Sequence, residues 1–125
     1  SYNQTSKCKR CISSNAYLLT ISVSAFAQDD YYIKKAQSYQ REAEYYQKKA
    51  DGYRREAEYY LKKAEGHQRE AAYYTKRGDI DRAKTQARYA ESALDYYKTQ
   101  LRYAQKADEK AAMYLKWAAN ALGKQ

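Results

Sequence analysis

The sequence predicts an all-α fold: a long antiparallel two-helix coiled-coil hairpin that follows a non-helical or cleaved N-terminal segment. Three observations support this fold class. A 14-residue repeat covers the middle of the chain, and a single glycine near residue 78 interrupts it. The 125 residues also include no proline. Because proline breaks helix interiors, its absence permits long uninterrupted helices.

Residues 1–27 differ in composition from the rest of the chain. Three basic residues between positions 7 and 10 precede an uncharged run that ends in Ala25-Phe26-Ala27. A basic segment, a short apolar segment and an A-x-A site are typical of a secretory signal peptide, which predicts an extracellular or periplasmic protein. Apolar and polar residues alternate over 19–25, which favours instead an ordered N-terminal arm with a strand. Both interpretations remain open.

The two cysteines, Cys8 and Cys11, lie in this first segment as a C-x-x-C motif. A structural zinc site needs four ligands, and the one histidine, His67, belongs to a distant helix, so we predict no metal site. If the segment is a cleaved leader, the cysteines have no role in the mature chain. If it is retained, they are candidates for a disulfide to a neighbouring chain.

Three copies of the repeat begin at Ala36, Ala50 and Ala64. Fourteen residues are two heptads, and a strict heptad period is typical of a left-handed coiled coil. With Ala36 at heptad position a, this helix has Ala at position a and Tyr at position d, except that His67 takes one Tyr place. Position f is basic and position b is mostly acidic, which predicts ion pairs between residues four apart on a solvated face.

Gly78 and Asp79 mark the predicted turn of a hairpin domain over residues 28–125, with helices over about 30–77 and 80–122. Glycine after a basic residue ends helices, and aspartate is a good N-cap. When the chain folds back at Gly78, residues whose numbers sum to 157 or 158 face each other. Nine of the twelve a and d layers then oppose a large residue to alanine. This size matching predicts that the two helices pack within one chain.

A second set of aromatic residues lies at heptad position c, outside this predicted seam. In the first helix, Tyr at position c alternates with Ser or Gly, and each Gly costs about 1 kcal/mol of helix stability relative to Ala. A regular row of exposed aromatic residues is typical of an association surface. The predicted association face consists of Tyr31, Tyr45, Gly52, Tyr59, Gly66, Tyr73, Tyr89, Tyr96, Tyr103 and Trp117.

The sequence therefore predicts a structural protein that assembles with copies of itself into an oligomer or a filament. Tyr and Lys side chains also make such an assembly a candidate for oxidative cross-linking. The alternative is a binding module for an anionic polymer, either nucleic acid or polysaccharide, because the formal net charge is +9. The aromatic and basic rows are expected on separate faces, which disfavours that alternative.

Catalysis is not predicted. The sequence offers no nucleophile–base pair, no cluster of metal ligands and no phosphate-binding loop, so we expect neither an enzyme nor a cofactor. No stretch reaches the roughly 18–20 apolar residues that a membrane-spanning helix needs, so no membrane span is expected.

Overall fold

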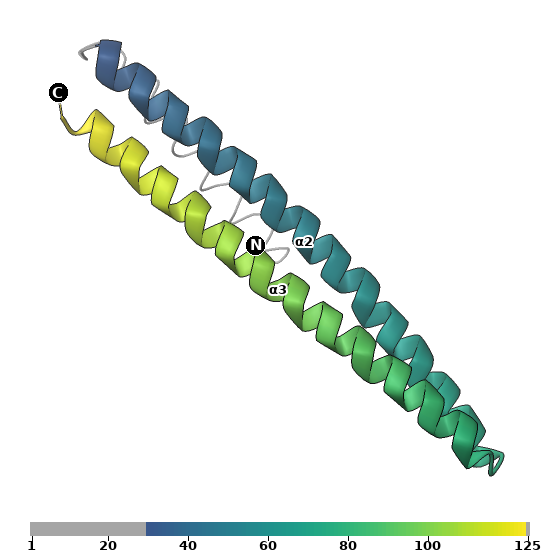
Figure 1. The fold of residues 1–125 in the computed structure, drawn as a ribbon. Helices are drawn as coiled ribbons and strands as arrows, with labels where there is room; N and C mark the ends of the chain where they lie inside the picture. Colours follow the sequence, from purple (N-terminus) through teal and green to yellow (C-terminus); the bar gives the residue numbers. More distant parts are fainter. Residues whose placement is uncertain (1–29, 125) are drawn as a thin grey trace, which may run out of the picture. The chain divides into compact units, whose positions relative to one another are not determined.

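The structure, a computed structural model, describes residues 30–124, which form two helices joined by a tight turn (Figure 1). Helix α2 spans Asp30–Lys76 and has 47 residues. Helix α3 spans Ile80–Leu122 and has 43 residues. The two helices pack against each other in opposite directions, so the predicted all-α helical hairpin is confirmed. Residues 1–27, with the candidate disulfide of Cys8 and Cys11, lie outside the described residues.

The turn is built as the sequence predicts. Gly78 has a φ of 79°, in the left-handed region that favours glycine. The amide of Gly78 donates to the carbonyl of Thr75 at 3.1 Å, and the amide of Asp79 donates to the carbonyl of Tyr74 at 2.9 Å. This pair of hydrogen bonds is the Schellman motif that closes a helix C-terminus. The Asp79 carboxylate then accepts from the amide of Arg82 at 3.2 Å, which caps α3.

Packing divides the hairpin into two compact units, which are described separately. The turn unit is Lys49–Ala107, the end of α2 with the start of α3. The terminal unit combines residues 30–48 of α2 with residues 108–124 of α3.

Alanine forms most of the core of each unit. In the terminal unit, Ala36 packs with Ala118, Ala121 and Leu122, and Tyr39 borders this cluster. The core of the turn unit is made by Ala50, Ala104, Ala107 and, at its edge, Tyr53. Because alanine is small on both sides, the two backbones approach closely, and none of the described large side chains is fully buried. The predicted pairs Tyr39 with Ala118 and Tyr53 with Ala104 therefore share a cluster.

The side of α3 that faces α2 differs from the predicted one. Position a was expected in the core, yet Ile80 is 50% exposed and Leu101 is 38% exposed. Alanines at position g are buried instead, at Ala93, Ala107 and Ala121. The prediction gave both helices the same a and d seam, whereas α3 mostly buries the alanines of its d and g positions. Leu122 is the one position-a residue of α3 that is buried among those described, and it packs with Ala36 as predicted. Where two backbones approach closely, only small side chains fit between them, so most leucines lie at the edge of the interface between the helices.

Candidate association face

The tyrosines at position c of α2 are exposed along the helix. Tyr31, Tyr45, Tyr59 and Tyr73 are between 50% and 59% exposed. Each ring makes an edge-to-face contact with the ring of the next residue, with centroids 5.0–5.2 Å apart and planes at 70–79°. That next residue is the position-d tyrosine, which is half-buried against α3. The exposed row is therefore held in place by rings of its own helix.

Basic groups lie over this exposed row. The ammonium of Lys35 is 5.6 Å from the centroid of the Tyr31 ring, and that of Lys63 is 5.4 Å from the Tyr59 ring. The Arg77 guanidinium is 5.4 Å from the Tyr73 ring and also donates to the Tyr73 hydroxyl at 3.1 Å. These distances are typical of cation–π contacts.

The expectation that the aromatic and basic rows occupy separate faces is therefore wrong. That expectation considered only the basic residues of position f. Position g is also basic at every second heptad, and it lies four residues after position c, which places its side chain directly over the c-position ring. The predicted pairing of positions b and f is present at Glu58 and Lys62, whose charged groups are 3.7 Å apart.

The position-c residues of α3 pack across the hairpin onto position d of α2. The Tyr96 ring stacks on the Tyr60 ring, with centroids 5.1 Å apart and planes at 25°. The same relation recurs every seven residues, with an aromatic or cationic side chain from α3 each time. The other pairs are Tyr39 with Trp117, Tyr46 with Lys110, Tyr53 with Tyr103, His67 with Tyr89, and Tyr74 with Arg82.

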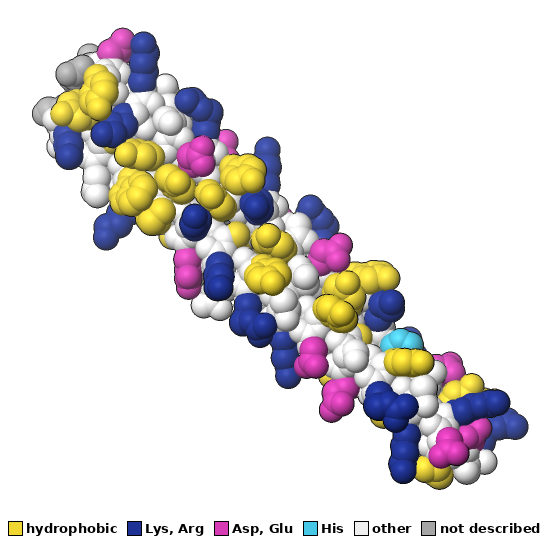
Figure 2. Space-filling view, viewed as in Figure 1, with side chains coloured by type: hydrophobic (Ala, Val, Ile, Leu, Met, Phe, Trp, Pro, Cys, Tyr) yellow, Lys and Arg dark blue, Asp and Glu magenta, His cyan; other side chains and the backbone are white. Residues whose placement is uncertain are grey.

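This α3 row nevertheless stays accessible. Tyr89, Tyr96, Tyr103 and Trp117 are between 40% and 57% exposed. Hydrophobic side chains and Lys or Arg side chains are interleaved on the face shown in Figure 2. All aromatic residues of position c were predicted to lie outside the packing between the two helices. For α3 this interpretation was wrong, because these residues cover the half-buried rings of α2.

One further aromatic residue belongs to the terminal unit and was missed. Tyr114 stacks on Tyr46, with planes at 9° and centroids 5.8 Å apart. Its ring centroid also lies 6.1 Å from that of Tyr39 and 5.4 Å from that of Trp117. Tyr114 is at position g of α3, the same position as the buried alanines, so a seam placed at d and g would have found it.

Gly52 and Gly66 are half-buried on α2. A Cβ atom built at either glycine would meet one heavy atom within 4 Å, the guanidinium tip of Arg55 or Arg69, at 3.9 Å. This is an ordinary van der Waals contact with the end of a flexible side chain. Packing within the chain therefore does not require glycine at these positions.

His67 replaces tyrosine in the ring row of the turn unit. Its Nδ1 forms a hydrogen bond of 2.7 Å with Oε1 of Gln86 on α3, and its ring lies 5.4 Å from the Tyr89 ring. The side chain is half-buried, as expected for a substitute at a seam position. Among the described residues, no group of three or more His, Cys, Asp and Glu side chains is placed to hold a metal ion.

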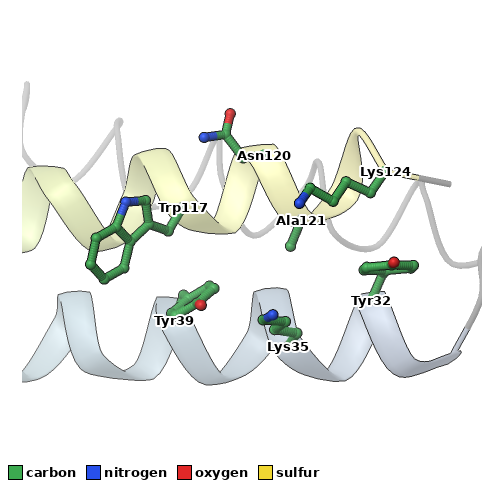
Figure 3. A pocket seen from close by; sticks show the side chains of 7 residues that line it. All are labelled: Tyr32, Lys35, Tyr39, Trp117, Asn120, Ala121 and Lys124. Carbon is green, nitrogen blue, oxygen red and sulfur yellow. The ribbon is translucent and has the colours of Figure 1, made fainter.

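A shallow groove of about 260 Å³ lies between the helices of the terminal unit (Figure 3). Its lining residues are Tyr32, Lys35, Tyr39, Trp117, Asn120, Ala121 and Lys124. Figure 3 shows the rings of Tyr39 and Trp117 at one end and that of Tyr32 at the other, with the Lys124 ammonium reaching back towards Ala121. The groove thus combines aromatic walls with two cations. The same combination occurs along the exposed position-c residues of α2, called the α2 row: Tyr31, Tyr45, Tyr59 and Tyr73, with the small residues between them.

Comparison of the chain with known protein families, with characterised proteins and with solved structures finds no match. Within residues 30–124, neither helix is long and apolar enough to cross a membrane. The functional interpretation therefore depends on the geometry of this hairpin.

Proposed function

We propose that the chain is a structural protein that associates with copies of itself through the association face, with the α2 row as the contact. The observation that carries this proposal is the strict alternation of exposed tyrosine with a small residue, Ser38, Gly52 or Gly66, where packing within the chain does not require the two glycines. Glycine inside a helix costs about 1 kcal/mol relative to alanine. Gly52 and Gly66 incur that cost without any benefit to packing within the chain, which favours a role in contact with another molecule.

The charges along α2 favour a second copy as that molecule. In the turn unit, position c reads Gly52, Tyr59, Gly66, Tyr73, while position g reads Glu56, Lys63, Glu70, Arg77, and all the g side chains are exposed. Size and charge thus alternate with the same period. A copy displaced by seven residues, about 10 Å along the helix, sets tyrosine against glycine and also sets cation against carboxylate. A partner unrelated in sequence would match both alternations only by coincidence.

The direction of the second copy decides the size of the assembly. If the second copy runs parallel to the first and is displaced by seven residues, half a repeat has no partner at each end of the pair. Further copies then add at these ends, and a filament grows. An antiparallel contact is two-fold symmetric and closes as a dimer. Only the parallel contact sets cation against carboxylate, because an antiparallel contact that pairs Tyr59 with Gly66 brings Lys63 next to Lys63 of the second copy. Both directions use the same tyrosines and glycines, so one set of variants tests the contact in either case.

The proposal is tested by Tyr45→Glu, Tyr59→Glu and Tyr73→Glu combined in one chain. Each substitution removes an aromatic ring from the contact and places there a carboxylate that loses solvation on association, so we expect the associated species to disappear in sedimentation velocity. Helix content should be unchanged, because Glu is at least as good a helix former as Tyr. The matched control is Ile80→Glu with Leu101→Glu, since these side chains are also large, apolar and exposed but lie off the face. Loss of association in the control, or its persistence in the tyrosine variant, contradicts the proposal.

A second candidate function, binding of an anionic polymer, is favoured by the cations that lie over the α2 rings. Aromatic rings that stack on bases, next to cations that contact phosphates, are typical of single-stranded nucleic acid binding. The test is fluorescence anisotropy of a single-stranded oligonucleotide with Lys35→Gln, Lys63→Gln and Arg77→Gln. Binding by this row requires an affinity that falls steeply with salt in the parent chain and a shallower slope in the variant. Equal slopes exclude these three cations as the binding site.

A further inference from the structure

Four pairs of tyrosine rings connect α2 with α3 in the described part of the chain. Two of them are near parallel: Tyr46 with Tyr114 at 9° and Tyr60 with Tyr96 at 25°. The Tyr60–Tyr96 pair is also the closest of the four, with centroids 5.1 Å apart.

We infer that Tyr60 and Tyr96 are a site of oxidative cross-linking, which joins α2 to α3 by a dityrosine bond within one chain. The inference depends on the turn unit alone and not on association between copies. Tyr96 is 57% exposed, so a one-electron oxidant reaches it from solvent. Both rings line a groove of about 190 Å³ on the surface of the turn unit, so each is accessible.

The chemistry balances with hydrogen peroxide as the terminal oxidant and a peroxidase as the one-electron carrier. Each tyrosine loses one electron and its phenolic proton, which gives two tyrosyl radicals. The radicals combine through the carbons next to their hydroxyl groups, and one carbon–carbon bond forms. The two ring hydrogens at those carbons then return to the oxygens as the rings regain aromaticity. Overall the pair loses two hydrogen atoms, and one peroxide is reduced to two water molecules.

Neighbouring rings are less suited to this coupling. The Tyr59 ring meets Tyr60 edge to face at 71°, and the two residues are adjacent in the chain, so a bond between their rings closes a small strained ring. In the terminal unit, the Lys110 ammonium is 5.3 Å from the Tyr46 ring and disfavours removal of an electron from it. Trp117, 5.4 Å from Tyr114, competes there for the radical. The Tyr60–Tyr96 pair has the shorter separation and no tryptophan neighbour among its described ring contacts.

The experiment oxidises the 125-residue chain with peroxidase and limiting hydrogen peroxide, at a dilution where sedimentation shows a monomer. Four single variants are compared: Tyr60→Phe, Tyr96→Phe and the controls Tyr59→Phe and Tyr97→Phe. Phenylalanine keeps the ring and its packing but cannot form dityrosine. Cys8 and Cys11 are alkylated beforehand, because a disulfide between them would also remove two hydrogen atoms. Intact-mass measurement then detects a monomer lighter by two hydrogen atoms, and fluorescence detects dityrosine.

We expect the cross-linked monomer in the parent chain and in both controls, and its loss in Tyr60→Phe and Tyr96→Phe. The parent product should also melt at a higher temperature than the untreated chain, because the bond removes loop-closure entropy from the unfolded state. The inference is overturned if the monomeric product survives in Tyr60→Phe and Tyr96→Phe. Dityrosine that forms only between chains at this dilution, or that fails to form, overturns it as well.

Discussion

The c rows of α2 and α3 both contain exposed tyrosines, but the surroundings of these tyrosines differ. Tyr59 on α2 is 54% exposed and Tyr96 on α3 is 57% exposed. The described ring and cation contacts of Tyr59 are with Tyr60 and Lys63 of its own helix. Tyr96 instead stacks on Tyr60 across the hairpin. Exposure alone therefore does not distinguish a residue that joins the helices from one that is available to a partner.

The comparison assigns different roles to the two rows. The α3 row covers the half-buried rings of α2, so we expect it to contribute to the stability of the hairpin. The described contacts of Tyr59 and Tyr73 in the α2 row lie within α2, so removal of these rings should leave the hairpin intact. The alternation of tyrosine with small residues, Gly52 and Gly66 among them, is found in the c row of α2 and not in that of α3.

The largest loss in the free energy of unfolding is expected from alanine substitutions in the α3 row, compared with the same substitutions in the α2 row. Tyr89→Ala, Tyr96→Ala and Tyr103→Ala each remove a ring contact between the helices, so each should lower the free energy of unfolding by about 1–2 kcal/mol. Tyr45→Ala, Tyr59→Ala and Tyr73→Ala should each change it by less than about 0.5 kcal/mol, as surface substitutions usually do. Urea denaturation followed by circular dichroism measures both sets. Equal losses in the two rows remove the distinction between them.

An effect of similar size is expected at the turn, which sets the register that places the α3 row over α2. Gly78→Ala puts a Cβ atom on a residue with φ of 79°, and the left-handed conformation costs about 1–2 kcal/mol for a non-glycine residue. Space is not the reason, since no heavy atom lies within 4 Å of the added Cβ. The same denaturation experiment should show this loss with unchanged helix content. A Gly78→Ala variant as stable as the parent means that the left-handed turn is not maintained in solution.

The smallest effect is expected from salt. Exposed ion pairs contribute about 0–1 kcal/mol and are screened by salt. We therefore expect the charges along α2 to set the displacement of the proposed second copy more than its affinity. Association measured by sedimentation should survive about 0.5 M salt, where the Debye length is only a few ångströms. Dissociation under these conditions indicates that charge, rather than aromatic contact, holds the copies together.

Heptad period and turn chemistry were sufficient to predict the hairpin. Alanine at position a, tyrosine at position d and the Gly78–Asp79 pair each specify local structure, and together they specify a fold. The seam of α3 was not predicted correctly, because the size matching of layers assumed that leucine belongs in the core. The choice of Ala93 and Ala107 over Leu101 depends on how closely two backbones approach, and a one-dimensional pattern does not contain that distance.

The association face stays a prediction, and its contacts within the hairpin were not predicted. All eight aromatic residues of the association face are exposed, and a Cβ atom at either glycine would meet only the tip of an arginine side chain. The stacking of Tyr96 on Tyr60 was not predicted, since the assumed layers paired Tyr60 with Tyr97 one residue further on. A helix turns by about 100° per residue, so an error of one position moves a ring from the seam to its edge. Register at this precision requires the structure.

Association through Gly52 and Gly66 of the α2 row is tested most directly by Gly52→Leu combined with Gly66→Leu. Leucine is the better helix former by nearly 1 kcal/mol at each position, so the monomeric hairpin should become more stable. The same side chains fill the space into which tyrosines of a second copy are proposed to fit, so sedimentation equilibrium should show weaker association than in the parent chain. A more stable hairpin with weaker association is the predicted result. Association equal to or stronger than that of the parent contradicts the use of these glycines as a contact.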